Sequence, residues 1–466
     1  MLVIAVPFAA AQRGGVAIED VTVLVGDGQR IAHANVFFQR GKIASVGNET
    51  ELPKSAVRIA GDGKFVTPGL IDCWSTLGLR ASQGGRSAWS KAADAFDRYA
   101  KEEIEAALRQ GVTTVYLPAR TFNGVGGYGA AVRLRADGAL EPIVLDDEVV
   151  LCAALGLDPG QGPLGRVKAA AELRGLWRGA VEYRRAWEDY QEDLEEYELK
   201  LKEKAEQKED GAKKSAKKGT TQRAGRKGPG GGAGAARAAK KGKEKPAGER
   251  DKKRDAGKKG KDELKKPEPP KKDRGKETLL RVLDGELALR VEVYRPEDIL
   301  NVLAITDEFN IALILEGASG AHHVAELLAD RSIPVVLGGA APPVQFSAGP
   351  LQHHRADAAA RLAAAGVEVY LGSGPGREGA SPTRHLALRA AREAGHGFDN
   401  DAALTALTSG AARLLGLEAR IGRVRRGLSA DLVLWSAHPF APDARVERVF
   451  VGGVEVYRAD DAEDSE

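Results

Sequence analysis

Apolar and polar positions along most of the chain follow a pattern that predicts short strands alternating with helices. The strand-like runs are 113–117, 287–293, 311–315, 333–337 and 367–371, and the helical patterns are 91–110, 296–308, 321–329, 355–365, 382–394 and 400–415. Strands that alternate with helices across short loops form a parallel sheet with crossover helices. About 300 residues of this alternation predict a (β/α)8 TIM-type barrel.

Both ends of the chain show a second pattern, of short β-rich runs separated by glycine turns. Near the start, the run Val21–Val25 precedes a turn at Gly26–Gly28, and near the end the run Val449–Val451 precedes Gly452 and Gly453. Such runs, bounded by glycines, are typical of strands and turns. We therefore expect the two ends to form one small β-sandwich.

A charged stretch interrupts the barrel pattern after residue 182. Its N-terminal segment, 183–210, carries apolar residues three or four positions apart, namely Trp187, Tyr190, Leu194, Tyr197 and Leu201. This spacing predicts an amphipathic helix with a narrow apolar seam. The segment that follows, 211–276, has one leucine, Leu264, and no isoleucine, valine or aromatic residue. It cannot bury enough surface to offset its ordering entropy, so we expect a long disordered Lys-rich insert.

The sequence thus predicts eight consecutive segments. They are a truncated signal segment (1–12), the N-terminal portion of the β-sandwich (13–66), the N-terminal portion of the barrel (67–182), a charged helix (183–210), the disordered basic insert (211–276), the C-terminal portion of the barrel (277–420), the C-terminal portion of the β-sandwich (421–460) and an acidic tail (461–466).

Charge is divided unevenly between these segments. The 466 residues carry a net charge of +3, but 211–276 hold 25 Lys and Arg against 8 Asp and Glu, so this stretch is +17 and the rest is −14. An acidic globular region argues against a uniformly basic nucleic-acid-binding face. The insert itself could bind nucleic acid or another anionic surface, or it could simply be a solvated charge run.

The ends and the cysteines bear on localisation. Leu2–Ala11 is a short apolar run ending in three alanines, which is typical of a truncated secretory signal, although a basic start is missing. The protein would be exported if this segment is a signal and cytoplasmic otherwise; a buried N-terminal strand is the other interpretation. The two cysteines are too few for a disulfide framework. No apolar run is long enough to span a bilayer.

Motifs at both ends of the barrel carry a family resemblance. Val66-Thr67-Pro68-Gly69-Leu70-Ile71-Asp72 begins the barrel, and Leu407–Ala412 and Ala430–Trp435 follow it. In these motifs the chain resembles the amidohydrolase superfamily, in the group of imidazolonepropionases and related cyclic-amide hydrolases. The resemblance implies a (β/α)8 barrel with a composite β-sandwich. It also implies hydrolysis of non-peptide C–N bonds by water activated on zinc or another divalent metal.

The metal-ligand positions of that family are substituted in this chain. The resemblance places the two ligands of its His-x-His motif on Trp74 and Thr76. The later ligand and catalytic positions fall on Glu292 or Tyr294, on Gly317 and on Gly374. Indole and neutral hydroxyl groups are poor zinc ligands. We therefore expect no metal and no other cofactor.

Other residues offer only weak replacements for the lost ligands. The eight histidines are scattered or adjacent on helices, as His322 and His323 are, and adjacent helical positions cannot share an ion. Asp72, Glu292 and Glu316 should lie near strand ends at the barrel mouth. They are the candidate catalytic residues, either as a carboxylate site for a hard cation or as hydrogen-bonded remnants of a pocket.

Two further motifs do not meet the requirements of a cofactor site or a nucleophile site. Gly124, Gly126, Gly127, Tyr128 and Gly129 match G-x-G-x-x-G, but no clear helix follows to bind a dinucleotide pyrophosphate, so we interpret the segment as a flexible loop over the barrel mouth. Cys73 has no evident base beside it to act as a nucleophile.

Two functions remain open from sequence. One is a catalytically degenerate member of the family with a binding or scaffold role for a small-molecule or other ligand. The other is an active hydrolase of amide or cyclic-amide bonds that uses an atypical carboxylate site. The oligomeric state is not indicated.

Overall fold

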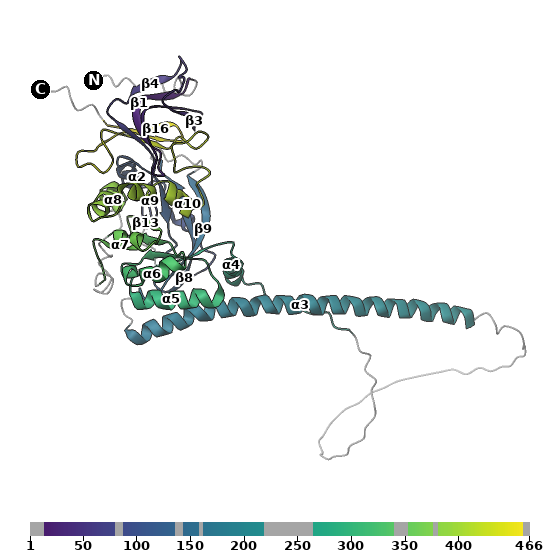
Figure 1. Cartoon of the computed structure of the whole chain (residues 1–466). Coiled ribbons are helices and arrows are strands. Elements are labelled where there is room, and N and C mark those ends of the chain that lie inside the picture. Colours follow the sequence, from purple (N-terminus) through teal and green to yellow (C-terminus); the bar gives the residue numbers. More distant parts are fainter. Residues whose placement is uncertain are drawn as a thin grey trace, which may run out of the picture. The chain divides into compact units, whose positions relative to one another are not determined.

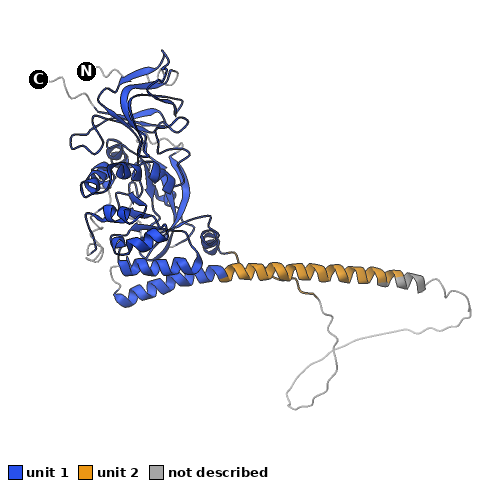
Figure 2. Cartoon of the chain, in the orientation of Figure 1, with its two compact units in different colours: residues 1–181, 273–466 blue, residues 182–272 orange. Residues whose placement is uncertain are grey.

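A computed structural model describes residues 14–79, 87–135, 143–157, 162–218, 264–339, 353–375 and 381–459. The chain divides into two compact units, residues 1–181 with 273–466, and residues 182–272 (Figure 2). The expected signal segment, the acidic tail and most of the basic insert (219–263) lie outside the described residues. No helix in the described regions of the chain is long and apolar enough to cross a membrane.

An eight-stranded sheet curls into the predicted barrel (Figure 1). Its order is β13-β12-β11-β10-β9-β8-β7-β6. The strands are β6 (Leu70–Asp72), β7 (Val112–Leu117), β8 (Gly124–Arg133), β9 (Val144–Ala154), β10 (Leu289–Val293), β11 (Leu313–Gly317), β12 (Val335–Leu337) and β13 (Val369–Leu371). A parallel bridge between Ser75 and Gly374 links the first strand to the last, so the barrel is nearly closed.

One strand departs from the predicted all-parallel pattern. β8 runs antiparallel to both β7 and β9, and it contains Gly124, Gly126, Gly127, Tyr128 and Gly129. The prediction of a mouth loop there was wrong. A Cβ on Gly126 would collide with the carbonyl oxygen of Ala119, and a Cβ on Gly127 with that of Ser90. These glycines therefore allow close backbone approach within a sheet rather than loop flexibility.

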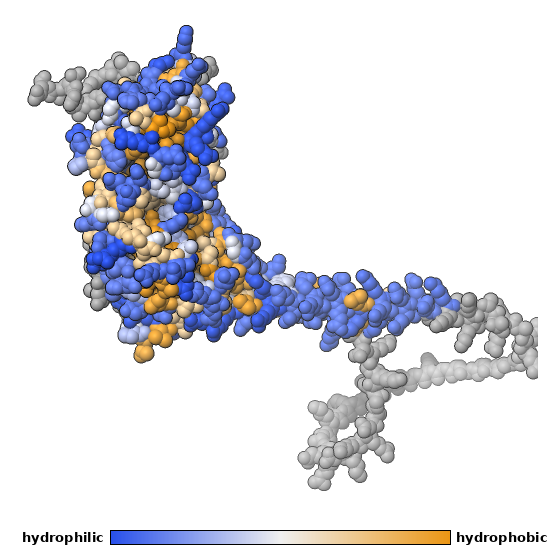
Figure 3. All heavy atoms as spheres, in the orientation of Figure 1, coloured by the Kyte–Doolittle hydropathy of each residue, from blue (hydrophilic) through white to orange (hydrophobic). Residues whose placement is uncertain are grey.

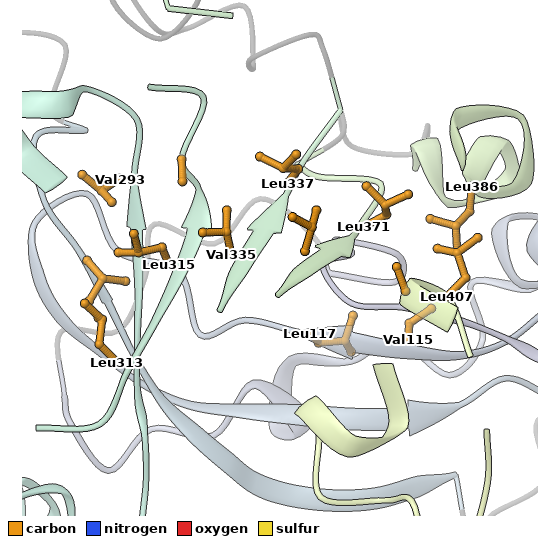
Figure 4. Packing of buried hydrophobic residues seen from close by; sticks show 14 of the residues in the cluster. Val115, Leu117, Val293, Leu313, Leu315, Val335, Leu337, Leu371, Leu386 and Leu407 are labelled. Carbon is orange, nitrogen blue, oxygen red and sulfur yellow. The ribbon is translucent and has the colours of Figure 1, made fainter. Parts of the chain in front are cut away.

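Helices cover the outside of the barrel. They are η1 (Ala92–Ala95), α2 (Lys101–Leu108), α5 (Pro296–Phe309), η2 (Ala321–Val324), α6 (Ala325–Asp330), α7 (Ala358–Ala364), η3 (Pro382–His385), α8 (Leu386–Gly395), α9 (Asn400–Ala406) and α10 (Ser409–Leu414). Alternate strand residues pack with them in one large apolar core, including Val293, Leu315 and Leu337 (Figure 4).

The two chain ends form a second eight-stranded sheet, as the sequence predicted. Its order is β16-β15-β14-β5-β1-β2-β3, with β4 paired to β1. The strands are β1 (Val16–Leu24), β2 (Arg30–Gln39), β3 (Lys42–Gly47), β4 (Val57–Ala60), β5 (Phe65–Pro68), β14 (Leu432–Trp435), β15 (Val446–Val451) and β16 (Val454–Arg458). The antiparallel pairing of β5 with β14 joins the N-terminal and C-terminal portions of this sheet.

The charged helix is longer than predicted. Helix α3 (Pro163–Lys218) begins 20 residues before the expected start at 183 and includes 211–218 of the expected insert. Helix α4 (Arg274–Leu283) takes the insert's last residues; the Asp273 side chain caps it by accepting hydrogen bonds from the backbone of Gly275 and Lys276. Residues 211–218 and 274–276 are therefore helical and not disordered, which corrects both boundaries.

Candidate functional site: the filled barrel lumen

Strand alternation decides which side chains face the barrel lumen. On β10, Leu289, Val291 and Val293 pack in the outer, helix-covered core. Because successive residues of a strand point to opposite faces, Arg290 and Glu292 face inward. Both are buried, at 2% and 3% exposure. The lumen therefore contains two oppositely charged side chains two residues apart on one strand.

Arg290 forms an ion pair across neighbouring strands. Its Nε donates to Oε2 of Glu316 on β11 at 2.5 Å, and its Nη2 donates to the carbonyl oxygen of Cys73 at 2.5 Å. Its guanidinium carbon lies 4.0 Å from the centre of the Tyr116 ring, a cation–π distance. The group thus joins β10 to β11, to β7 and to the residue that follows β6. Its Nη1 has no hydrogen-bond partner among the described residues.

Glu292 is held by a second arginine. Arg120 donates from Nε to Oε2 at 3.1 Å and from Nη2 to Oε1 at 2.9 Å, in a bidentate pair. The Tyr294 hydroxyl also donates to Oε1, at 3.0 Å. Glu292 and Glu316 are register partners on adjacent strands. Two neighbouring carboxylates are therefore matched by two guanidinium groups.

Asp72 belongs to a separate network that seals the seam between the first and last strands. Its Oδ1 accepts from the backbone N–H of Trp74 (3.1 Å) and of Ser373 (2.8 Å), and its Oδ2 accepts from the Thr383 hydroxyl (2.9 Å). The Thr383 oxygen also lies 2.6 Å from the Ser75 hydroxyl oxygen. The carboxylate's oxygens are thus occupied by donors from the ends of β6 and β13 and from η3.

Trp74 fills the lumen beside the glycines at three strand ends. A Cβ on Gly338 would collide with Cζ3 of the indole, and a Cβ on Gly372 would lie 2.5 Å from the Trp74 Cβ. A Cβ on Gly317 would lie 3.4 Å from the indole Cη2 and 2.9 Å from Cε1 of Tyr294. The glycines at the ends of β11, β12 and β13 therefore make room for two large rings.

The positions to which the resemblance assigns metal ligands form no metal site among the described residues. Trp74 and Tyr294 are buried rings, and Gly317 and Gly374 have no side chain to offer; Thr76 is half-buried. Among the described residues no three or more His, Cys, Asp or Glu side chains gather as a metal would require. The residues present do not fit a catalytic zinc ion, which needs three protein ligands and an open position.

The sequence placed the three candidate carboxylates correctly at the strand ends, but only two of them meet. Glu292 and Glu316 are neighbours, whereas Asp72 is bound by its own donors. Sequence reasoning missed the partners Arg290, Arg120 and Thr383. For Arg290 a signal existed, because a charge inside an apolar strand, two positions from a glutamate, indicates a lumen-facing pair.

In the described parts of the chain, the histidines and the cysteine thiols form no ion pair with the lumen carboxylates. His322 and His323 stack with ring centres 4.2 Å apart, and His323 lies 5.4 Å from the ring of His353. Cys73 and Cys152 are both free and buried. Burial raises the pKa of the Cys73 thiol to about 12 and that of Cys152 to about 11, so neither is a ready nucleophile.

Burial also controls ionisation within the lumen. It raises the pKa of Glu316 to about 7, although the Arg290 charge acts in the opposite direction. Burial raises the pKa of Asp72 as well, against its hydrogen bonds. Burial alone would lower the pKa of Arg290, but attraction to Glu316 raises it, so the guanidinium stays charged. Glu316 can therefore exchange a proton near neutral pH beside a fixed cation.

The fold and the lumen together define a class: a nearly closed βα barrel with a composite sheet, whose centre is filled by rings and ion pairs. One comparison matches part of the chain to a family model. Residues 286–456 match the model of the amidohydrolase family.

The chain is also similar to three proteins, one by sequence and two by structure. The amidohydrolase tasK of Hapsidospora irregularis is 28% identical over 182 residues, which are 38% of this chain and 18% of that protein. The chain thus matches less than a fifth of that relative's length. The crystal structure of an amidohydrolase from Thermotoga maritima MSB8 has a TM-score of 0.69 at 24% identity, covering 95% of this chain and all of that one. A prolidase complexed with N-methylphosphonate-L-proline has a TM-score of 0.52 at 18% identity, covering 96% and 100%. The two structures show the fold alone.

A first prediction concerns the packing of Trp74. Gly338→Ala should lower the free energy of unfolding by about 1–3 kcal/mol, because the new methyl group meets the indole. In a Trp74→Ala background the same change should cost nothing or stabilise, since it fills the cavity. Urea unfolding of the two single variants and the double variant measures this coupling.

The control is Gly175→Ala on α3, where a Cβ meets nothing within 4 Å. This change should raise stability by up to about 1 kcal/mol in both backgrounds. Additive effects of Gly338→Ala and Trp74→Ala would contradict the packing account.

A second prediction concerns pH. The pKa of Glu316 is about 7 in the folded protein against an ordinary value of 4.5, so the folded state binds a proton that the unfolded state releases in this window. Its contribution to stability is complete below about pH 4.5 and falls as pH rises through 7. The destabilisation caused by Glu316→Gln should therefore shrink by up to about 3 kcal/mol between pH 4.5 and 8.

Urea unfolding at several pH values measures this difference. Glu172→Gln, on an exposed glutamate of α3, is the matched control and should show no such trend. A pH-independent difference between the native protein and Glu316→Gln would mean that Glu316 does not titrate in this range.

Proposed function

We propose that this chain is a catalytically degenerate amidohydrolase-family protein with a binding or scaffold role. The observation that carries the proposal is the pairing of the lumen carboxylates. Glu316 is bound by Arg290, and Glu292 by Arg120 and Tyr294. Family chemistry uses a metal-bound water as the nucleophile, whereas here each of these carboxylates is already neutralised by a guanidinium group.

The nature of the cation supports the same proposal. A guanidinium neutralises a carboxylate through fixed, planar N–H donors, and it has no coordination position for water. Arg290 thus supplies positive charge to the barrel centre without supplying an activated nucleophile. Because it contacts Cys73 and Tyr116 as well as Glu316, its place in the lumen is fixed on several sides.

The packing of the lumen gives a second, independent support. Trp74, on which the resemblance places the first ligand of the family's His-x-His pair, is 1% exposed. The glycines around it accommodate the ring. A single lost ligand could be compensated by a neighbour, whereas a ring with matching glycines on three strands indicates an interior adapted to a filled centre.

A third prediction follows for metal content. Purified protein should hold no stoichiometric zinc, manganese or iron by elemental analysis, and its Tm should not change when Zn²⁺ or Mn²⁺ is added, because the described residues contain no ligand set to bind them. Dialysis against a chelator should likewise leave the Tm unchanged. One ion per chain would overturn the proposal of a degenerate site.

A second candidate is an active hydrolase that uses Glu292 without a metal. The supporting observation is that Arg120, which holds Glu292, is 29% exposed at its side chain, so solvent comes near this carboxylate. The Tyr294 hydroxyl beside it could donate to a developing negative charge. The bond class would be an amide or cyclic amide, as the resemblance implies.

A fourth prediction separates the two candidates. If the second one holds, the native protein should hydrolyse some cyclic amide or dipeptide in the presence of chelator, and Glu292→Gln should reduce the rate by at least about 100-fold, as expected for loss of a general base. Glu172→Gln is the control for the charge change. Under the degenerate proposal no member of such a substrate panel turns over in either protein.

A further inference from the structure

Unit 2, residues 182–272, contains an apolar seam along helix α3. Between residues 183 and 201 the positions Tyr183, Trp187, Tyr190, Leu194, Tyr197 and Leu201 alternate in steps of four and three. All but the last have reduced exposure, while nearly every residue between them is exposed. The Trp187 ring contacts Tyr190 at 5.8 Å and Tyr183 at 6.2 Å between centres. This set of six residues is called the aromatic seam below.

A second stripe lies on the chain that returns to α4. In residues 264–272 only Leu264, Pro267 and Pro270 are half-buried, and the residues between them are exposed. A repeat of three, in a segment with three prolines and no helix or strand, is the pattern of a polyproline II helix with one face covered. This segment is called the proline strap below.

The two stripes match in length and spacing. The seam spans 18 residue steps, about 27 Å at the rise of an α-helix. The strap spans eight residue steps, about 25 Å at the rise of polyproline II. The steps of four and three along the seam repeat every seven residues, which is about 10.5 Å. The half-buried positions of the strap repeat every three residues, which is about 9.3 Å. Both segments belong to the same compact unit.

We propose that the aromatic seam of α3 is a docking groove for a Lys-flanked polyproline II segment, and that the proline strap of the same chain occupies it. Proline-rich segments in this conformation bind grooves lined by aromatic rings because they lose little conformational entropy on binding. The proposed contact is between aromatic rings and the faces of proline rings. The Trp187 indole nitrogen is shielded from solvent and has no hydrogen-bond partner among the described residues, so the contact of this ring is apolar.

Charge favours the same occupant. Residues 188–198 of the helix carry seven acidic side chains and no basic one. The strap carries four lysines, Lys265, Lys266, Lys271 and Lys272, against one acid, Glu268. Opposite charges on the two stripes would add an attraction between them that salt screens. Figure 3 shows the visible face of this helix as mostly hydrophilic, with one small hydrophobic patch.

The strap also has a place in the chain's path. It is the segment through which the chain leaves the basic stretch and reaches α4 at Asp273. Docking on the aromatic seam would hold the proline strap against helix α3. Because the strap and the seam belong to the same chain, the strap has a high effective concentration at the seam. The proposal therefore makes the strap the resident ligand, which a competing proline-rich segment has to displace.

The test uses the full chain with two nitroxide labels, one at Glu195→Cys on the helix and one at Glu268→Cys on the strap. Both positions are exposed, and the native Cys73 and Cys152 are buried. Pulsed electron–electron double resonance should give one short, narrow distribution of the distance between the two nitroxides, and this distribution should not depend on protein concentration. Raising salt to about 1 M should broaden it, since screening weakens the charged contact.

Matched variants distinguish the docked face from its opposite. Pro270→Lys should reduce the short-distance population at least twofold, because Pro270 lies on the covered face, whereas Pro269→Lys should leave it unchanged, because Pro269 is exposed. On the helix, Trp187→Ala should act like Pro270→Lys. Leu199→Ala, at a 60% exposed position off the seam, should have no effect.

Equal effects of Pro269→Lys and Pro270→Lys would overturn the proposal, as would a broad distance distribution in the native chain. A mixture of chains labelled only at Glu195→Cys and chains labelled only at Glu268→Cys tests for docking between copies. A short distance in this mixture would mean that the strap of one copy binds the seam of another, which contradicts docking within one chain. Circular dichroism detects any variant that unfolds. If Trp187→Ala unfolds the helix, the comparison of Pro270→Lys with Pro269→Lys on the strap tests the proposal.

Discussion

The Arg290–Glu316 ion pair is the constraint on which the rest of the barrel depends. Two carboxylates at register positions of adjacent strands cannot both stay ionised in a dry lumen without nearby cations. Arg290 supplies one cation and also ties β10 to β11 and to the end of β6. Replacing a buried pair by apolar residues is often neutral for stability, whereas removing one partner costs about 3–5 kcal/mol. The pair therefore fixes the arrangement of the lumen more than it adds net stability.

Packing around Trp74 is the steric counterpart of this electrostatic arrangement. The strand ends that meet the indole carry glycine, and the one at Gly317 also admits Tyr294. Tyr294 in turn donates to Glu292, so ring packing and charge pairing share a residue. Because protein interiors are close-packed, rings and glycines of this kind have to change together. A Trp74→His substitution alone would leave a void and would not release the paired carboxylates, so the filled centre is a property of the whole lumen.

Strand–helix alternation was enough to predict the barrel, and the motifs at both ends were enough to predict the composite sheet. β8 was missed because its glycines resemble a loop; the collisions that a Cβ would make with Ala119 and Ser90 appear only once the sheet is formed. The early start of α3 was missed because Pro163, Gly165 and Gly175 weaken its helical signal. In the site, alternation located Glu292 and Glu316, whereas Arg120 and Thr383 reach the lumen from segments outside the barrel strands, whose contacts are set by tertiary structure.

The charge division in the sequence acquires a physical meaning from unit 2. Four of the 25 basic residues in 211–276 lie in the proline strap, opposite in charge to the acidic stretch of α3. If the strap docks as proposed, these lysines are partly neutralised within the chain, and an anionic partner of the basic stretch has to compete with the helix for them. Binding of such a partner and opening of the groove would then be linked, since each removes charge that the other needs. Under the proposal, the acidic residues 188–198 and the four strap lysines act as one electrostatic unit.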